Sequence, residues 1–218
     1  MTLHIMVEGP SEFIFFEGWA KKLNSNQHIR VHSHQGKGKL PPTTAKANPK
    51  LRGLLDQLPY KLRAFASTLN SNSDGILILV DADDDDPLDL TKKISQVVKR
   101  CAPDLKIEIS IATEEMEAFY LGDLKALKRA YPSADMKLAR AYIPDSICGT
   151  WEKFGEVIGD DGGNKVAWAE NMGDWITTNP AQSRSPSFRT MLGKISTLTL
   201  QPAPASSRKK FYHRAKNK

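Results

Sequence analysis

Residues 76–80 form an unbroken run of five aliphatic side chains, and this run is the strongest constraint on what the chain can fold into. It has the length of one strand, and a strand that is apolar at every position is typical of a parallel sheet covered by helices on both faces. The run ends in acid, because Asp81 and Asp83 open a stretch of five aspartates that stops at Pro87. We therefore expect a buried strand whose carboxyl end carries a group of carboxylates.

The first 120 residues alternate between strand-like and helix-like patterns. Strands are predicted at 3–7, 28–34, 76–80 and 106–112, and helices at 11–23, 50–69, 88–100 and from a cap at Thr113 through Tyr120. This alternation is typical of an α/β fold with a mainly parallel sheet flanked by helices. We expect that core over residues 1–122, a helical C-terminal part packed on it over 123–200, and a basic tail without fixed structure over 201–218. Within the C-terminal part, helices are predicted at 124–131, 151–158, 166–176 and 188–195.

The net charge of the chain comes from its tail. The chain has 31 basic and 25 acidic residues, a formal net charge of +6, and residues 201–218 hold six of the basic residues and no acidic one. Arg208, Lys209 and Lys210, with Phe211 and Tyr212 beside them, have the composition of a segment that binds the phosphate backbone of a nucleic acid. A solubilising tail explains the same composition equally well, so both interpretations stay open.

Several classes of protein are disfavoured by what the sequence lacks. No apolar stretch approaches the roughly 20 residues of a membrane-spanning helix. Residues 1–10 show no secretory signal, so we expect a cytoplasmic location without a membrane partner. Two cysteines are too few for a disulfide framework, and the chain has neither the phosphate-binding loop of an ATPase nor the nucleophile elbow of a hydrolase. His28, His32 and His34 lack a fourth ligand at zinc spacing, so alternation along a strand explains them better.

Acidic side chains follow three of the four predicted strands. In a parallel sheet such strand ends meet at one edge, where ligands bind. At about 4 Å and an effective dielectric near 20, one pair of like charges costs roughly 4 kcal/mol, so such a group persists where a cation occupies it or where some acids face solvent. Oxygen ligands without cysteine favour Mg²⁺ or Mn²⁺. The acids are Glu8 and Glu12, then Asp81 and Asp83, then Glu114, Glu115 and Glu117.

The arrangement of these acids resembles that of the Toprim domain, the metal-binding fold of primases, topoisomerases and OLD-type nucleases. The shared pattern is a glutamate after the first strand, here Glu8, and an Asp-x-Asp after a later apolar strand, here Asp81 and Asp83. Glu12, four residues after Glu8, resembles the OLD-type version. Glu117 resembles a further acidic position in a family of short stand-alone Toprim-like proteins of uncharacterised function, which residues 36–38 and 184–189 resemble as well.

The resemblance implies a Toprim-like fold and a Mg²⁺- or Mn²⁺-dependent nuclease that cuts phosphodiester bonds, with DNA as the expected substrate. Glu8, Asp81 and Asp83 would hold one or two ions, and Glu12 and Glu117 would complete or orient the second site. OLD-type relatives act with an ATPase in defence against phage, so a separate ATPase partner is implied too. Lys165 and Arg189 are the candidates for a catalytic cation that shares the charge of the transition state. Contacts to the nucleic acid are expected from a further set of residues: Lys37, Lys39, Ser187, Arg189, Arg208, Lys209 and Lys210.

Other interpretations of the same residues stay open. A Toprim-like module could bind nucleic acid or an ATPase without cutting. A phosphate-accepting receiver-like domain is disfavoured, because the strand after Asp83 does not end in lysine. Glu12, Glu114 and Glu115 also suit the first turn of a helix, where a carboxylate interacts favourably with the helix dipole. Ser185 and Ser187 could meet a phosphate at a helix start or simply cap that helix.

Overall fold

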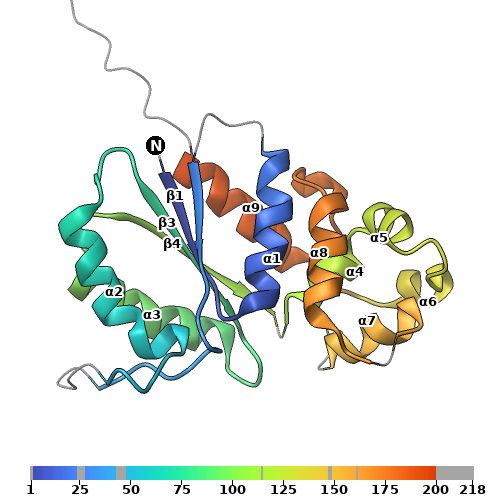
Figure 1. Cartoon of the computed structure of the whole chain (residues 1–218), viewed down its shortest axis with the longest axis horizontal. Coiled ribbons are helices and arrows are strands. Elements are labelled where there is room, and N and C mark those ends of the chain that lie inside the picture. Colours follow the sequence, from blue (N-terminus) through green and yellow to red (C-terminus); the bar gives the residue numbers. More distant parts are fainter. Residues whose placement is uncertain are drawn as a thin grey trace, which may run out of the picture.

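The structure, a computed structural model, describes residues 2–23, 28–42, 48–113, 115–146, 149–160 and 162–199. At its centre is a four-stranded sheet in which all strands run parallel, in the order β2-β1-β3-β4. The strands are β1 (Thr2–Met6), β2 (His28–His32), β3 (Gly75–Asp81) and β4 (Lys106–Ala112). Helices flank this sheet and form a C-terminal part (Figure 1), so the expected α/β class is confirmed, and the architecture is consistent with a Toprim-like fold.

Strand β3 lies inside the hydrophobic core, as its apolar run predicts. Ile76, Ile78 and Val80 pack on one side of the sheet, in a cluster with α2 (Leu54–Thr68) and α3 (Pro87–Cys101). Leu77 and Leu79 belong to the cluster on the other side, with α1 (Pro10–Trp19) and α9 (Pro186–Thr199). All five side chains are at most 1 % exposed, and burying each one contributes roughly 1.5–3 kcal/mol. The two helical layers therefore hold the strand, and the acids that follow it, in a fixed position.

The strand order creates a topological switch point between β1 and β3. From β1 the chain passes through α1 to β2 on one side, and from β2 it passes through α2 to β3 on the other side of β1. In open parallel sheets, ligands bind beyond the carboxyl ends of the two strands at such a point. The segments that follow Met6 and Asp81 are therefore where a site is expected.

The helical C-terminal part shares its core with the sheet. After α4 (Glu117–Gly122), the last helix of the expected core, it contains α5 (Leu124–Ala130), α6 (Met136–Ala141), α7 (Thr150–Ile158) and α8 (Lys165–Trp175), and α9 then returns to β3 and β4. Helix α8 crosses α1 closely, because a Cβ atom on Gly173 would lie 2.8 Å from the carbonyl oxygen of Phe15. One buried cluster continues from the sheet through α1 and α8 into α7. Helices α5, α6 and α7 lie at the end of the molecule away from α2 and α3 (Figure 1).

Four local features differ from the sequence-based expectations. Thr113 does not cap the helix after β4, because α4 begins only at Glu117 and the side chain of Glu115 turns toward Trp151 and Lys165. The helix expected over 11–23 ends at Trp19 and continues as a 3₁₀ turn, η1 (Ala20–Lys22). A second 3₁₀ turn, η2 (Pro180–Gln182), precedes α9, and helix α6 has no counterpart among the predictions. Within the described ranges, no helix is both long and apolar enough to cross a membrane.

Candidate metal centre

The acids after β1 and β3 meet at the switch point. Glu8 lies two residues beyond the end of β1, and its Oε1 atom accepts a hydrogen bond from the backbone N–H of Asp81 at 2.9 Å. The backbone carbonyl of Glu8 accepts a further bond from Gly36 at 2.8 Å. The structure thus brings together two acids that are 73 positions apart in the sequence.

Burial and mutual repulsion disfavour the ionised form of these carboxyl groups. Burial raises the pKa of Glu8 to about 8, and Glu12 and Asp83 add to the shift while the bond from Asp81 opposes it. Burial also raises the pKa of Asp81 well above its ordinary value, and the carboxylates of Glu8 and Glu12 push it further. Shifts in this direction are what desolvated, mutually repelling acids show when no cation lies between them.

Asp83 belongs to a loop that a lysine holds in place. Its backbone has φ 48°, a left-handed conformation that few side chains adopt without support. The ammonium of Lys37 donates to Asp83 at 3.1 Å and to the carbonyl of Ala82 at 2.8 Å, and it pairs with Asp85 at 2.7 Å. Burial opposes the effect, but the carboxylates of Asp85 and Asp83 raise the pKa of Lys37. In the structure, Lys37 is therefore a clamp on the acidic loop, whereas the side chain of Lys39 is exposed.

The loop that carries Lys37 depends on glycine. Gly38 has φ 67°, and a Cβ atom there would lie 2.4 Å from a carboxylate oxygen of Asp56 and 3.0 Å from the Cα of Gly53. The carbonyl of Lys37 accepts from the backbone N–H of Leu55 at 2.8 Å, so the loop is docked on the start of α2. This close approach fixes the direction in which Lys37 reaches the acids.

The third group of acids brings in a lysine from the C-terminal part. Glu117, in the first turn of α4, is only 4 % exposed. Burial raises the pKa of Glu117 to about 7, although the ammonium of Lys165 lowers it. Lys165, the first residue of α8, donates to Oε1 of Glu115 at 2.9 Å and lies 5.2 Å from the ring centre of Trp151. Burial opposes it, but Glu117 and Glu115 raise the pKa of Lys165, and Asp81 contributes to the same shift.

Glu115, which in the sequence suits a carboxylate in the first turn of a helix, is part of the site in the structure. Besides binding Lys165, it accepts from the backbone N–H of Trp151 at 3.0 Å, so it fixes the start of α7 as well as the lysine. Glu114 lies outside the described residues. The place of Glu115 in the acidic group after β4 marks it as a candidate in the sequence. Its partner Lys165 could not be found in the same way, because it is 50 positions away.

A buried hydroxyl lies near the same acids. Tyr120 is fully buried on α4, three residues after Glu117, and its hydroxyl oxygen has no hydrogen-bond partner among the described residues. Burial raises the pKa of Tyr120 well above its ordinary value, and Glu117, Glu12 and Asp81 add to the shift. A buried hydroxyl usually has a partner, in the protein or in an ordered water molecule. The position of Tyr120 fits a hydrated ligand between these acids.

The residues gathered here fit a hard divalent cation by their chemistry. The donors are carboxyl oxygens, which Mg²⁺ and Mn²⁺ prefer, and a cation among them would favour the ionised forms that burial and mutual repulsion disfavour. Their side chains are not yet arranged as a cage, because no group of three or more His, Cys, Asp or Glu among the described residues is placed to hold a metal ion. Binding would therefore need rotation of carboxylates such as Glu12 and Asp83.

At the start of α9, where the sequence predicts a phosphate contact at Ser187, the donor groups bind a carboxylate of the chain itself. Asp145 accepts from the backbone N–H of Ser187 at 2.7 Å, from its hydroxyl at 2.9 Å and from the hydroxyl of Ser185 at 3.1 Å. Ser187 is buried, whereas Arg189 is exposed on α9. Arg208, Lys209 and Lys210 lie outside the described residues. Residues 184–187 are thus anchored to the loop that carries Asp145.

The site and the fold define an α/β protein with an acidic group at the switch point of a parallel sheet. Residues 7–196 match the model of a protein family described as "Domain of unknown function (DUF4276)". This match spans most of the chain, so the protein belongs to that family. Searches of curated proteins and of solved structures gave no significant match.

Proposed function

We propose that the protein is a metal-dependent nuclease that hydrolyses phosphodiester bonds, with Mg²⁺ or Mn²⁺ held by Glu8, Asp81 and Asp83 and with Glu12 and Glu117 beside them. The proposal rests above all on the meeting of Glu8 and Asp81 at the switch point, where their carboxylates have raised pKa values. When bound, the ion activates water and stabilises negative charge on the phosphate oxygens.

The chain's own residues contribute position and charge to this reaction. Lys165, held by Glu115, supplies positive charge beside Glu117 and Asp81, where a phosphate would enter. Lys37 keeps the backbone of Ala82 and Asp83 in the conformation that presents their loop to the site. A preorganised cation of this kind stabilises the charge that develops on a phosphate in the transition state.

A cleavage assay tests the proposal directly. Full-length protein is incubated with supercoiled plasmid and with 5′-labelled single- and double-stranded oligonucleotides, in Mn²⁺, in Mg²⁺ and in EDTA. We expect metal-dependent products that disappear in Asp81→Asn and Glu8→Gln, while binding of the oligonucleotide in EDTA is kept. Cleavage that persists in both variants, or in EDTA, contradicts the proposal.

A second candidate is a non-catalytic module that binds nucleic acid or a separate ATPase. The lack of a preformed three-ligand group among the described side chains favours it. The same assay separates the two functions, because the module would bind oligonucleotide without cutting it under any metal condition. An ATPase partner and a role in phage defence remain predictions of the Toprim resemblance.

A further inference from the structure

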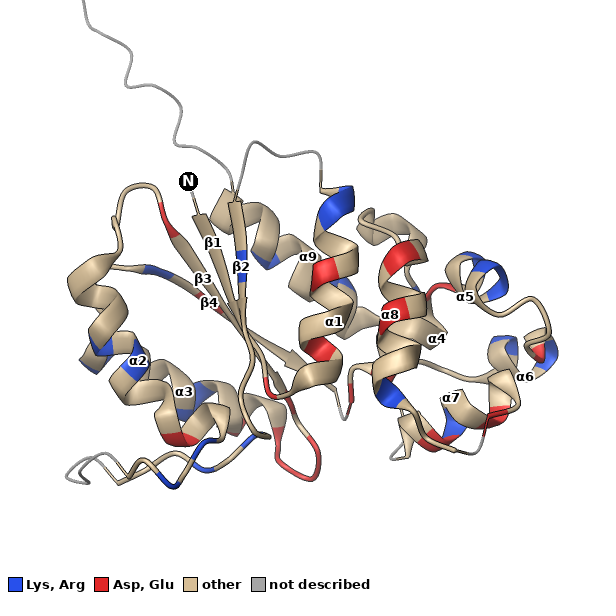
Figure 2. Ribbon diagram, viewed as in Figure 1, with Lys and Arg blue, Asp and Glu red and all other residues tan. Residues whose placement is uncertain are grey.

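A second charged surface lies on helices α5 and α6, apart from the acidic edge of the sheet. Residues 124–141, which span both helices, contain five basic residues and one acidic residue, Asp135. The carboxylate of Asp135 accepts from the backbone N–H groups of Lys137 and Leu138 and so caps α6. Figure 2 shows basic residues on α5 and α6 at one end of the molecule and the acidic loop after β3 near its middle. The basic segment and the acidic loop thus lie in different parts of the molecule.

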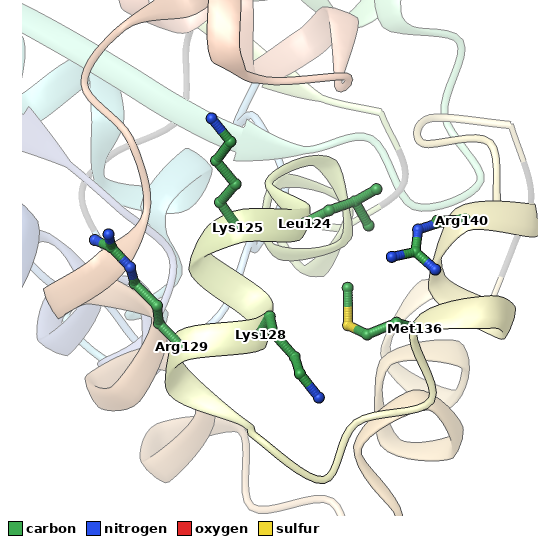
Figure 3. Close-up of a pocket in the computed structure, with 6 residues that line it drawn as sticks. All are labelled: Leu124, Lys125, Lys128, Arg129, Met136 and Arg140. Carbon is green, nitrogen blue, oxygen red and sulfur yellow. The ribbon is translucent and has the colours of Figure 1, made fainter.

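A cavity of about 420 Å³ lies between these two helices (Figure 3). Leu124 and Met136 form the apolar part of its lining, and all the other lining residues are cations. Figure 3 shows Arg140 and Met136 reaching from α6 toward Leu124, while the cations of α5 spread outward from their helix. We call this surface the basic groove; its four cations are Lys125, Lys128, Arg129 and Arg140.

The cations of the basic groove are available to a ligand. All four are exposed, and none forms an ion pair within the part of the chain that the structure describes. Arg129 lies 5.6 Å from the ring centre of Trp175, and Lys128 donates to the carbonyl of Pro132, so both are oriented by neutral groups that leave their charge uncompensated. Four exposed like charges that form no ion pair in the described part of the chain favour binding of an anion.

The backbone of α6, which carries Arg140 of the basic groove, is held in place by Arg184. The guanidinium of Arg184 donates to the carbonyls of Ala139, Arg140 and Tyr142, at 3.2, 3.3 and 2.6 Å. These bonds close the C-terminal end of α6 and tie it to the segment before α9. The backbone that carries Arg140 is therefore fixed before any ligand arrives, which lowers the cost of ordering on binding.

We propose that the basic groove binds the backbone of a single-stranded nucleic acid. The three cations of α5 spread outward and do not converge with Arg140 on one point (Figure 3), which suits the repeated charges of an extended strand better than a single small anion. Trp175, which is 48 % exposed beside Arg129, offers a face on which a base can stack, as in other surfaces that bind single strands. The inference extends the proposed nuclease function, because the groove would hold the strand whose phosphodiester is cut.

Fluorescence anisotropy in EDTA tests the groove without requiring catalysis. A labelled 20-nucleotide DNA and its RNA counterpart are titrated with the full chain and with the double variant Lys125→Glu with Arg140→Glu. The control double variant, Lys21→Glu with Lys99→Glu, has the same net charge, and its exposed lysines lie in η1 and in the last turn of α3, at the opposite edge of the sheet from the acids. Trp175→Ala tests the stacking surface.

We expect the groove variant to bind at least tenfold more weakly and to lower the slope of log affinity against log salt by roughly 1 to 2. The control variant should bind within about threefold of the wild type, and Trp175→Ala should weaken single strands more than duplex. Lysine acylation mapped by mass spectrometry should show that oligonucleotide protects Lys125 and Lys128. Equal loss in both double variants, equal competition by polyglutamate or by a free mononucleotide, or no protection of these lysines overturns the proposal.

These outcomes are independent of cleavage. If binding is lost only in the groove variant but no metal supports cutting, the groove is upheld and the nuclease proposal fails. If the protein cuts and the groove variant binds and cuts like the wild type, the groove proposal fails alone.

Discussion

The Oε1 atom of Glu8 accepts a 2.9 Å hydrogen bond from the backbone N–H of Asp81, across the ends of β1 and β3. This bond favours the ionised form of Glu8, yet burial and neighbouring acids outweigh it and raise the pKa of Glu8 to about 8. A site that collects acids against their mutual repulsion is less stable than one with neutral side chains of the same shape. A cation bound between the acids would remove this loss of stability.

The first prediction concerns the stability of the metal-free protein. An acid whose pKa is raised on folding stabilises the fold fully only below its ordinary pKa of 4.5, and the contribution is lost as the pH rises through its folded pKa of about 8. In EDTA the contribution of Glu8 to the melting temperature should therefore fall between pH 4.5 and pH 8. Glu8→Gln should flatten this decline and stabilise the metal-free protein at pH 8 by about 1–3 kcal/mol.

Calorimetry or thermal-shift measurements check this prediction, with and without Mg²⁺ or Mn²⁺. The ion should raise the melting temperature of the wild type more at pH 8 than at pH 6, and it should have no effect on Glu8→Gln. Glu17→Gln, which changes an acid on α1 outside the group, is the matched control. In EDTA, a change in melting temperature from pH 6 to pH 8 that is the same in Glu8→Gln as in the wild type would contradict the account.

The second prediction distinguishes the role of Lys165 from that of Glu115, which holds it in place. Lys165→Met should lower the cleavage rate about 10²–10³-fold, because a preorganised cation is lost from the site. Metal affinity, measured by titration calorimetry with Mn²⁺, should be unchanged or increased, since one positive charge near Glu117 is removed. Glu115→Gln keeps the lysine but weakens its anchor, so a smaller loss of rate is expected. Equal losses in both variants would show that Lys165 is only a structural partner of Glu115.

The sheet could be predicted from the sequence because its signal is local. The apolar residues of β3 and the alternation along β4 identify strands wherever they occur, and β4 has the bounds Lys106–Ala112 that the pattern predicts. Helix α6 has only six residues, fewer than two turns, so no periodicity marks it. Asp135 gives it a local capping signal, but the bonds from Arg184 that close its C-terminal end come from 42 to 45 positions away.

The candidate site could be predicted in part. Glu8 and Asp81 follow strands that the pattern locates, and the switch-point rule then brings them together. The roles of the lysines could not be predicted, because Lys37 and Lys165 lie in loop-like sequence and find their acidic partners 46 and 50 positions away. Asp145 is a similar case: nothing in its own sequence neighbourhood indicates that it caps α9.

The third prediction distinguishes a clamp from a phosphate contact at Lys37. Lys37→Gln should lower the melting temperature, because Asp83 and Asp85 lose their shared ammonium and the left-handed backbone of Asp83 loses support. Mn²⁺ affinity should be unchanged or increased, since the carboxylate of Asp83 is released from an ion pair. Lys39→Gln, two residues later on the same loop and exposed, should change neither quantity. A direct phosphate contact at Lys37 predicts the opposite: normal stability, with a smaller salt dependence of oligonucleotide binding.

The fourth prediction concerns a histidine pair on the neighbouring strands β1 and β2. The rings of His4 and His32 stack at 5.2 Å, with Nδ1 of His4 and Nε2 of His32 2.9 Å apart, and burial lowers the pKa of His32 to about 4. A lowered histidine pKa means that stability is lost as the pH falls below 6.5 toward 4. His32→Phe keeps a ring beside Phe65 and should reduce this acid lability, as measured by urea unfolding at pH 7 and pH 4.5. If the free energy of unfolding falls by the same amount between pH 7 and pH 4.5 in His32→Phe and in the wild type, the prediction is refuted.

The fifth prediction tests whether Asp145 anchors α9. Its carboxylate holds the backbone N–H of Ser187 and the hydroxyls of Ser185 and Ser187, and its own φ of 66° suits glycine or asparagine. Asp145→Gly removes all these bonds without adding backbone strain and should cost about 2–4 kcal/mol. Asp145→Asn keeps one acceptor oxygen and should cost less, about 1 kcal/mol. Because α9 packs on β3 and β4, the loss should also appear as faster hydrogen exchange in those strands, whereas an effect confined to α9 would show that the sheet is stable without its anchor.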